Sequence, residues 1–434
     1  MSGNVNDVLL PGRGLPGKES RKAQGKGFKL LGHCDFGGMG KGDVMQIILH
    51  GDYLLCGHIG LSRAGVSVVD VSNSSKPRLV NQISAPPNTH NTKLQISGDL
   101  MIVNNEQWDV GEEGAHRAGI DVYDLSNLPE LKHVSFFPVG GKGCHRMWFI
   151  DGKYAFLPGD DDEYLDQFLR IVDLQDPTKP EEVGRWWVPG MKNEEERDWY
   201  HMTNHRKNKK GEYINTQGMP QGTHPKRVAL HTPYAVGNRV YNAWWDSGLI
   251  ILDIDDISNP KFISHLDLPD HESASTHSIL TLPERNLLVV VDEFISYDCE
   301  DMTKRIRVVD ISDEKNPKVI SMLPVPEGDY VDHGGRFGPH NLHENRPGSR
   351  IETNLVFQCY FNAGLRVFDI KDPYNPSEVA HYVPATPNRA PVRIWDDFHV
   401  VQVQVDDVYL AQDGRVFISE RLGAGVWILE QEFS

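Results

Sequence analysis

The sequence predicts an all-β fold, a seven-bladed β-propeller whose ring is closed by an N-terminal strand that pairs into the last blade. Three observations predict it: a phrase that recurs along the chain, a composition rich in turn residues, and an N-terminal run that matches the end of the phrase. The phrase is a continuous apolar run that ends in an acidic residue, then a turn with Pro and a more polar run. Its copies are centred on Asp70, Asp124, Asp173, Asp253, Asp310, Asp369 and, in altered form, Glu430.

Each repeat carries four strand signals. In the second repeat these are Thr92 to Ile96, Leu100 to Asn104, Ile120 to Leu125 and Leu131 to Phe136. The third run of each repeat is apolar on nearly every residue, which is expected of a strand covered on both faces. The 40 Gly and 27 Pro residues suit many short strands joined by turns.

The seventh repeat lacks its fourth run after Glu430. The segment Phe28 to His33 resembles the fourth runs of the other repeats, so we expect it to supply the missing strand and to remove an open edge. The domain prediction is therefore an N-terminal extension, residues 1–27, and one propeller domain, residues 28–434, with a lid-like insertion at about 190–226. The alternative of two or more separate β domains would leave the N-terminal run unexplained.

Composition excludes several classes of function. The formal net charge of −17 argues against nucleic acid or an anionic membrane as a partner. No apolar run reaches the roughly 18 residues of a membrane span, and the N-terminus has no apolar core of a secretory signal. The five cysteines are scattered without metal-site spacing, which favours reduced thiols and a cytoplasmic location over a disulfide framework.

Five repeats place a histidine at the start of their first strand, a few residues before the turn into the second. In a propeller this strand is innermost, so residues at its start in different blades converge at one mouth of the central channel. These histidines are His90, His145, His231, His277 and His340, and the first and last repeats have Asp43 and Asp406 at this position. His231 fits this register least well, because it lies six residues before the glycine of its turn, whereas His90 and His145 lie eight and seven before theirs. His224 also competes with it for the same role.

Neutral imidazole is the commonest metal ligand, and several imidazoles on one axis suit Fe, Mn, Cu or Zn better than Mg or Ca. We interpret the set as the site of one transition-metal ion, with iron first and Mn, Cu or Zn as alternatives. His90, His145, His277 and His340 are the predicted ligands, and His231 is a further candidate. The alternative for any one of them is a satisfied polar residue at the channel mouth.

Several second strands end in an acid at the same mouth. Glu106 and Glu293 are the catalytic candidates, because a carboxylate there can fix the tautomer of a ligating imidazole or act as a general base. The same strand-end position holds Asp160, Asp246, Glu420 and, in the first repeat, His58. These acids could instead only add solvated charge. Arg146, a third catalytic candidate, could bind a substrate carboxylate or form a salt bridge to an acid of a blade.

The repeated phrase resembles a known repeat. Val68-Val69-Asp70-Val71, Ile171-Val172-Asp173-Leu174 and Val308-Val309-Asp310-Ile311, each followed by a Pro turn, look like the LVIVD repeat of β-propellers. The wider architecture is similar to the selenium-binding-protein/methanethiol oxidase propellers. The methanethiol oxidase family uses a histidine-lined metal site, so this resemblance leaves a copper-type oxidase open as one reading. By geometry alone, four histidines backed by carboxylates resemble the iron site of carotenoid cleavage oxygenases. A shared fold does not fix function.

The insertion and several tryptophans are candidates for the walls of the site. His201 and His205 have helical spacing but lack the glutamate of an HExxH motif, so we favour a lid or a dimer contact over a second metal site. The tryptophans near predicted strand ends could line an apolar pocket or pack between blades. They are Trp108, Trp148, Trp244 and Trp245.

These observations predict a metal-dependent enzyme that acts on a small organic molecule, with an oxygen-using oxidoreductase as the first hypothesis. A hydrolase or carbon–carbon lyase that uses the metal as a Lewis acid is the second. A non-enzymatic propeller scaffold is the third, although a scaffold does not need imidazoles on its axis. Neither nucleic acid nor membrane is an expected partner, and a homo-oligomer is left open.

Overall fold

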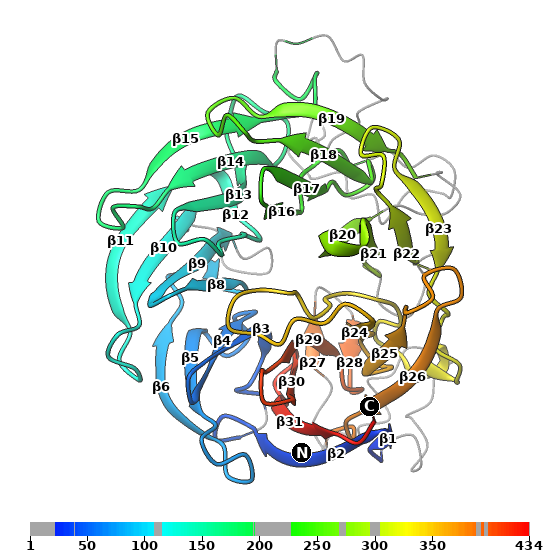
Figure 1. Ribbon diagram of the computed structural model, residues 1–434. Helices are drawn as coiled ribbons and strands as arrows, with labels where there is room; N and C mark the ends of the chain where they lie inside the picture. The colour runs from blue at the N-terminus through cyan, green and yellow to red at the C-terminus, as the bar shows by residue number, and fades with distance from the viewer. Residues whose placement is uncertain are drawn as a thin grey trace.

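The computed structural model describes residues 22–38, 40–107, 115–193, 195, 227–268, 275–295, 304–387, 392–394 and 398–433. Within these ranges the chain forms β-strands and two short 3-10 helices, Pro283–Arg285 and Tyr330–His333. Figure 1 shows the sheets standing in a ring, with β3, β8, β16, β20 and β29 nearest the centre. The predicted all-β, propeller-like architecture is confirmed.

Three sheets are four-stranded antiparallel meanders in chain order. Their strands are β3 (Val44–His50), β4 (Tyr53–His58), β5 (Ala64–Asp70) and β6 (Arg78–Ser84); β16 (Thr232–Val236), β17 (Arg239–Ala243), β18 (Leu249–Asp253) and β19 (Lys261–Leu266); and β20 (Thr276–Leu282), β21 (Leu287–Asp292), β22 (Ile306–Asp310) and β23 (Lys318–Met322). In each sheet the first strand lies toward the axis and the last on the outside (Figure 1).

A nine-stranded sheet contains two further meanders. They are β8 (Leu94–Ser97), β9 (Leu100–Gln107), β10 (Gly119–Asp124) and β11 (Lys132–Pro138), then β12 (Gly140–Cys144), β13 (Tyr154–Asp160), β14 (Phe168–Asp173) and β15 (Glu181–Trp186). The two are joined because β12 pairs with both β13 and β9. The two-residue strand β7 (Thr89–His90) also pairs with β9 and places His90 opposite Glu106. Local pairing therefore positions two of the predicted site residues.

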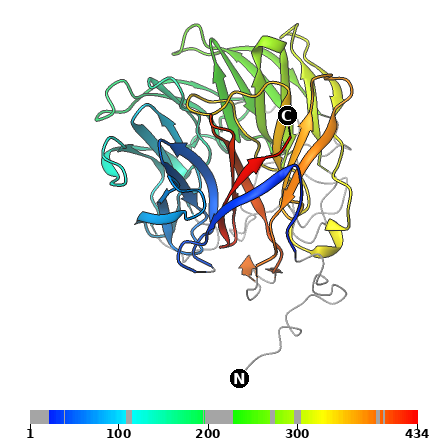
Figure 2. The same ribbon diagram turned by 60° about the horizontal axis from the view of Figure 1, so that its bottom comes forward.

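The N-terminal run supplies the outer strand of the last sheet, as predicted. β2 (Phe28–Cys34) pairs with β31 (Gly425–Gln431), which follows β29 (Val405–Leu410) and β30 (Arg415–Glu420). Figure 2 shows β2 alongside β31, so the two ends of the chain meet in one sheet. The His33 ring stacks on Trp427 with a centroid distance of 4.5 Å, which adds side-chain contact to the backbone pairing.

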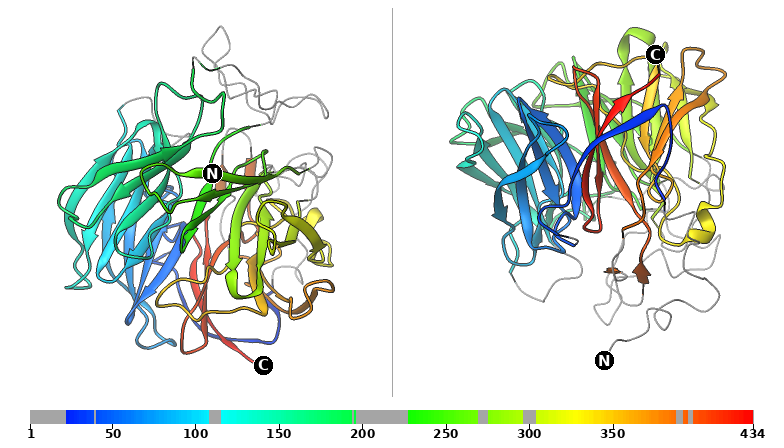
Figure 3. Two further views of the ribbon diagram at one scale, coloured as in Figure 1. Left: turned by 45° about the horizontal axis from the view of Figure 1, so that its top comes forward. Right: turned by 90° about the horizontal axis from the view of Figure 1, so that it is seen from below.

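A second N-terminal strand was not predicted. β1 (Gln24–Lys26) pairs with β26 (Ser377–Val383), the outer strand of the sheet that also contains β24 (Leu355–Cys359) and β25 (Leu365–Asp369). Figure 3 shows the N-terminal strands, in blue, reaching from the last sheet, in red, to the orange sheet beside it. β1 has no apolar pattern, because all three of its residues are exposed. A short hairpin of β27 (Val392–Ile394) and β28 (Phe398–Val400) completes the strands.

The aspartate that ends each phrase starts a turn. Its carboxylate accepts a hydrogen bond from the backbone N–H two residues later, an Asx turn that leads to the outer strand. The distances are 3.0 Å at Asp70, 2.9 Å at Asp124, 2.8 Å at Asp173, Asp253 and Asp310, and 2.7 Å at Asp369. The repeated acid is therefore explained by folding, and it belongs to the turn chemistry of the scaffold.

Neighbouring sheets also touch where an outer strand passes the turn of the next sheet. Serine hydroxyls donate to turn carbonyls at 2.5 Å in three such places: Ser135 to Pro177, Ser264 to Glu314 and Ser321 to Pro373. The corresponding positions in β2 and β15 are Gly32 and Gly184. A Cβ atom there would lie 1.9 Å from the carbonyl oxygen of Ser74 and 2.1 Å from that of Ile257, so these contacts exclude any side chain.

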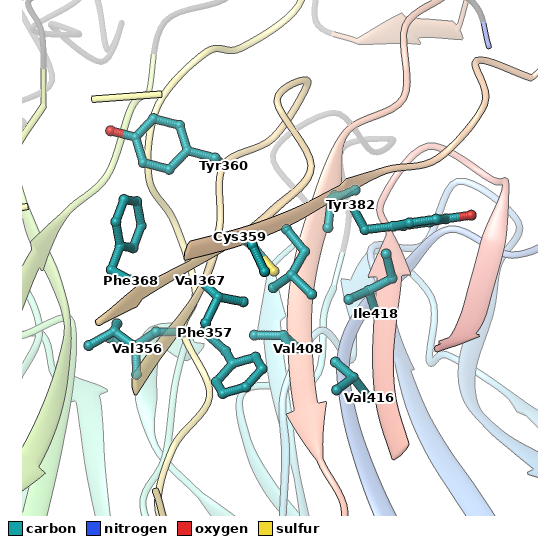
Figure 4. Close-up of a cluster of buried hydrophobic side chains, with 14 of the residues drawn as sticks. Val356, Phe357, Cys359, Tyr360, Val367, Phe368, Tyr382, Val408, Val416 and Ile418 are labelled. Carbon is teal, nitrogen blue, oxygen red and sulfur yellow. The ribbon is translucent and has the colours of Figure 1, made fainter. Parts of the chain in front are cut away.

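The hydrophobic core lies between the sheets. Figure 4 shows Val356, Phe357 and Val367 of β24 and β25 beside Val408 and Val416 of β29 and β30, and all five belong to one buried cluster. Apolar residues on both faces of the middle strands thus hold adjacent sheets together.

Part of the predicted wall of the site lies outside the described residues. This holds for most of the insertion at about 190–226 and for Trp108, His201, His205 and His224. Among the residues that the structure describes, no helix is long and apolar enough to cross a membrane.

Candidate metal centre

The five predicted histidines lie next to one another. His90 and His145 both contact the carboxylate of Glu106. From His145 the rings continue to His231, His277 and His340, with centroid distances of 4.8, 3.9 and 4.4 Å. The repeat therefore brings together imidazoles from five separate parts of the chain, as the histidine register predicts.

Hydrogen bonds fix the tautomer of three of these imidazoles. The Nδ1 atom lies 2.6 Å from Oε2 of Glu106 in His145, 2.8 Å from the carbonyl oxygen of His277 in His231, and 3.1 Å from the carbonyl oxygen of Asp406 in His340. Because carbonyl and ionised carboxylate oxygens only accept, the proton belongs on Nδ1 and Nε2 keeps its lone pair. Metal-ligating histidines in proteins are held in this way.

Burial keeps the inner imidazoles neutral. It lowers the pKa of His231, His277 and His340 well below the ordinary value, and nearby positive charges lower it further. The Nε2 atom of His231 is buried and has no hydrogen-bond partner among the described residues. An unsatisfied polar atom in a buried site is costly, and a bound cation would satisfy this lone pair.

Glu293 faces the Nε2 side of the imidazoles. Its two carboxylate oxygens lie 3.6 Å from Nε2 of His277 and 3.7 Å from Nε2 of His340, and Arg336 donates to it at 2.9 Å. Ligand atoms of His231, His277 and Glu293 all lie within 4.8 Å of one another. Two ligand atoms about 2.1 Å from one ion stand at most about 4.2 Å apart, so the three residues are close to a binding geometry.

Glu106 occupies a different position from Glu293. Its Oε2 atom lies 2.8 Å from Nε2 of His90 and 2.6 Å from Nδ1 of His145. Burial alone would raise the pKa of Glu106, but the His145 and His90 imidazoles outweigh it and hold the pKa well below its ordinary value. Glu106 is therefore ionised and orients His145. His90 contacts this carboxylate, and the ring-to-ring contacts described above run through the other four histidines.

The other strand-end residues are bonded elsewhere. Asp160, Asp246 and Glu420 accept hydrogen bonds from backbone N–H groups, at 3.1 Å from Lys142, 2.8 Å from Arg227 and 3.0 Å from Leu422. His58 is fully buried between Asp43 and Ser67, at 3.0 and 2.7 Å, so both of its ring nitrogens are satisfied within the first sheet. These contacts stabilise loops and strand ends.

Arg146, the residue after His145, is fully buried. It donates to Asn341 and forms an ion pair with Glu344, so the structure matches the salt-bridge alternative rather than an exposed carboxylate-binding group. The residue that follows each histidine is polar and buried, a feature that sequence reasoning missed. The residues of this second layer are Asn91, Arg146, Thr232, Ser278 and Asn341. Their fixed step after each histidine is the signal that could have revealed them.

Two aromatic side chains border the imidazoles. Trp245, a predicted wall residue, lies edge-on to His231, and Phe361 stacks on His340, each with a centroid distance of 4.9 Å. Both have positive φ, 35° for Trp245 and 44° for Phe361. Non-glycine residues in this conformation are uncommon and often lie at functional sites. Sequence reasoning missed Phe361.

The remaining described tryptophans contribute to packing. Trp148 packs on Tyr234 with a centroid distance of 4.9 Å, and Trp244 meets Trp186 edge-on at 5.4 Å. Both are buried between sheets. They match the packing alternative of the sequence analysis.

Replacing Glu106 with Gln should weaken metal binding by about 10- to 100-fold, the usual cost of losing a group that orients a ligating histidine. The Gln amide keeps the size of the side chain, but its single oxygen is a weaker acceptor than an ionised carboxylate shared by two imidazoles. Competition with a chromophoric chelator measures the affinity. The matched control is Glu430→Gln, an exposed glutamate paired with Lys29. Equal affinities for both variants would contradict this role of Glu106.

Comparisons with known proteins agree with the repeat and the fold. The LVIVD repeat matches residues 41–84 and 234–267, which contain β3 to β6 and β17 to β19. No curated protein matches the sequence. The structure is similar to the WD40 β-propeller domain of Doa1 (10% identity, 94% of this chain, 98% of that chain, TM-score 0.55). It is also similar to the β-propeller domain of Myceliophteria thermophila Cps50 (Swd1) (11% identity, 90% of this chain, 97% of that chain, TM-score 0.53). A further similar structure is the Pseudomonas aeruginosa periplasmic gluconolactonase PpgL (10% identity, 86% of this chain, 93% of that chain, TM-score 0.54).

At these identities the likeness to solved structures concerns the fold alone. Two stretches of the chain thus match the LVIVD repeat, and the ring of antiparallel sheets has the fold of a β-propeller.

Proposed function

We propose that the protein is a metal-dependent enzyme with one transition-metal ion at the mouth of the propeller axis. The ligands would come from His145, His231, His277 and His340 and from the carboxylate of Glu293. The observation that carries this proposal is the pair of buried, neutral imidazoles of His231 and His340, whose Nδ1 atoms are bound to carbonyl oxygens, together with the unsatisfied Nε2 atom of His231. Such a shell of nitrogen donors suits a transition metal.

Iron is the metal that we place first, with Mn, Cu or Zn as alternatives. Two imidazoles and one carboxylate, as in His231, His277 and Glu293, are the donor set of non-haem iron oxygenases. An ion bound there would supply redox chemistry with oxygen or polarise an oxygen of the substrate. We therefore propose an oxygen-using oxidoreductase that acts on a small organic molecule.

The protein residues around the ion would have separate tasks. Glu106 fixes the orientation of His145, and Arg336 neutralises Glu293. Trp245 and Phe361 lie against the imidazoles and keep water from two sides of the site. The side chains of Glu106 and His145 are 14% and 23% exposed, whereas those of His231, His277 and His340 are at most 3% exposed, so a substrate would approach from the His145 side.

A hydrolase or carbon–carbon lyase is the second candidate. The position of Glu293 favours it, because a carboxylate beside the Nε2 atoms of His277 and His340 could act as a general base. The ion would then serve as a Lewis acid.

Metal analysis tests the proposal. We expect about one equivalent of a transition metal per chain, after purification or after reconstitution with Fe(II) under anaerobic conditions. Nitric oxide, an oxygen mimic, should then give the electron paramagnetic resonance signal of an iron–nitrosyl complex. Less than about half an equivalent of any transition metal after reconstitution would contradict the proposal. Turnover that persists without oxygen and with Zn would select the hydrolase or lyase.

The four-stranded units favour seven blades. We propose that β7 to β11 and β12 to β15 are two blades joined through the contact of β12 with β9, and that each of the other four-stranded meanders is one blade. A segment before β24 would serve as the innermost strand of the sixth blade, because His340 and His343 donate backbone hydrogen bonds to Cys359 and Phe357.

We further propose a cytoplasmic location and a small molecule as the partner, with an oligomeric state left open. The cysteines Cys34, Cys56, Cys144 and Cys359 are free and buried, which suits a reducing compartment. The net charge of −17 disfavours nucleic acid and anionic membranes.

A further inference from the structure

Lys93 is a buried lysine that the metal centre does not use. Its side chain is almost fully buried, and its Nζ atom has no hydrogen-bond partner among the described residues. An ammonium group has three donors, and leaving all of them unsatisfied inside a protein is costly. A hydrogen-bond acceptor beside Lys93 would therefore stabilise its ammonium group.

Strand alternation points Lys93 toward the axis. Leu94 and Ile96 belong to the hydrophobic cluster between sheets. Because successive side chains in a strand point to opposite faces, Lys93 and Gln95 lie on the other face, and β8 is one of the strands nearest the centre (Figure 1). The charge of Lys93 also lowers the pKa of His231, His277 and His340, so the ammonium lies near three of the histidines.

Two side-chain amides whose NH2 groups lack a partner among the described residues accompany Lys93. Gln46 accepts a hydrogen bond from the N–H of Leu94 at 2.9 Å, which holds its side chain beside the Lys93–Leu94 peptide. Gln95 follows two residues later on the same face. The Nε2 atoms of Gln46 and Gln95 are buried and lack a hydrogen-bond partner among the described residues. Three buried donor groups on β3, on β8 and just before β8 thus lack an acceptor among the described residues.

Lys93 keeps most of its positive charge although charged groups of both signs surround it. Arg146 and Arg421 oppose this charge, and Asp406 and Asp407 favour it. Burial lowers the pKa of Lys93 to about 8, so the group is still mostly protonated at pH 7.

We propose that Lys93, Gln46 and Gln95 form a binding subsite for a small carboxylate on the propeller axis, beside the histidines. A carboxylate supplies the negative charge and several acceptor lone pairs that an ammonium and two amides can satisfy. As part of a substrate it would anchor one end of the molecule near the metal, and this second step rests on the proposed function. The binding of the carboxylate itself does not.

The test measures binding of sodium formate, the smallest carboxylate, to the full-length protein after treatment with a chelator. Stability against urea should rise with formate concentration and saturate, since a ligand that binds only the folded state stabilises it by mass action. Sodium chloride at the same ionic strength and sodium phosphate are the comparison arms. Lys93→Met should weaken formate binding at least tenfold, whereas Lys132→Met, which removes an exposed lysine paired with Asp124, should not.

A second, nearly isosteric variant tests the subsite even if Lys93→Met fails to fold. Gln95→Glu places a carboxylate of the protein itself beside Lys93, so it should abolish the formate effect in a folded protein. The proposal is overturned if formate stabilises no more than chloride, if phosphate binds as tightly as formate, or if Gln95→Glu binds formate like the wild type. Formate binding that requires bound metal and ignores Lys93→Met would also overturn it. Formate binding by a protein that also takes up no metal on reconstitution would support the subsite and contradict only the proposed function.

Discussion

His231→Gln and His277→Gln should each reduce the metal content of the purified protein to less than about a tenth of that of the wild type. Both residues belong to the group whose ligand atoms lie within 4.8 Å of one another, and burial keeps both imidazoles neutral. The loss of affinity for the metal should exceed the 10- to 100-fold loss expected for a residue that only orients a ligand. Gln is preferred to Ala because it leaves a smaller cavity and no large apolar void.

The measurement combines elemental analysis with unfolding in the presence and absence of added Fe(II). A ligand at about 100 times its Kd stabilises the folded state by about 2.7 kcal/mol, so the wild type should gain stability and the two variants should not. His133→Gln is the matched control, because His133 is half-exposed on β11 and bonds Asp121 at 2.7 Å, away from the axis. A full equivalent of metal in either variant would rule out that residue as a ligand.

Gly32→Val should destabilise the protein by about 3 kcal/mol, the upper end of the usual cost of overpacking. A Cβ at this position would lie 1.9 Å from the carbonyl oxygen of Ser74, and Gly32 cannot move away without disturbing the pairing of β2 with β31. Since β2 joins the N-terminal part of the chain to the last sheet, the ring should open locally. Urea unfolding gives the free energy, and limited proteolysis at residues 22–34 reports the release of β2.

Two further variants distinguish the loss of stability caused by release of β2 from the loss caused by steric overlap alone. Leu30→Val introduces a β-branched residue at a half-exposed position of the same strand and should cost little. Gly184→Val creates a comparable contact with Ile257 between two other sheets, away from the closing strand β2. It should therefore lower stability without exposing residues 22–34 to protease. Equal stability of Gly32→Val and Leu30→Val would contradict the close approach of β2 to the neighbouring turn.

Much of the scaffold could be predicted because its signals are local. The apolar run that ends in an Asx turn recurs in every complete repeat, and strand alternation makes that pattern visible in one dimension. The pairing of Phe28–Cys34 with the last sheet followed from counting strands. The register of the histidines followed from the same repeat, since equivalent positions in a ring of sheets share a radius.

Other features depended on contacts between distant segments. β1 has no apolar pattern and becomes a strand only because β26 offers a free edge. Glu106 and Glu293 end equivalent strands, yet one accepts from Nδ1 of His145 and the other faces Nε2 of His277. Spacing could not distinguish these roles, because a side-chain rotation decides which ring nitrogen meets which carboxylate.

The sequence by itself determined the all-β repeat architecture, the closing strand β2 and the gathering of five histidines, because each follows from a periodic local pattern. Only the tertiary structure decided that His231 lies among the inner imidazoles, that His90 contacts Glu106 instead, and that Lys93 is buried without a partner. The physical reason is that tautomer, burial and hydrogen-bond satisfaction depend on atoms contributed by other sheets. Those atoms have no fixed distance along the chain from the groups that they serve.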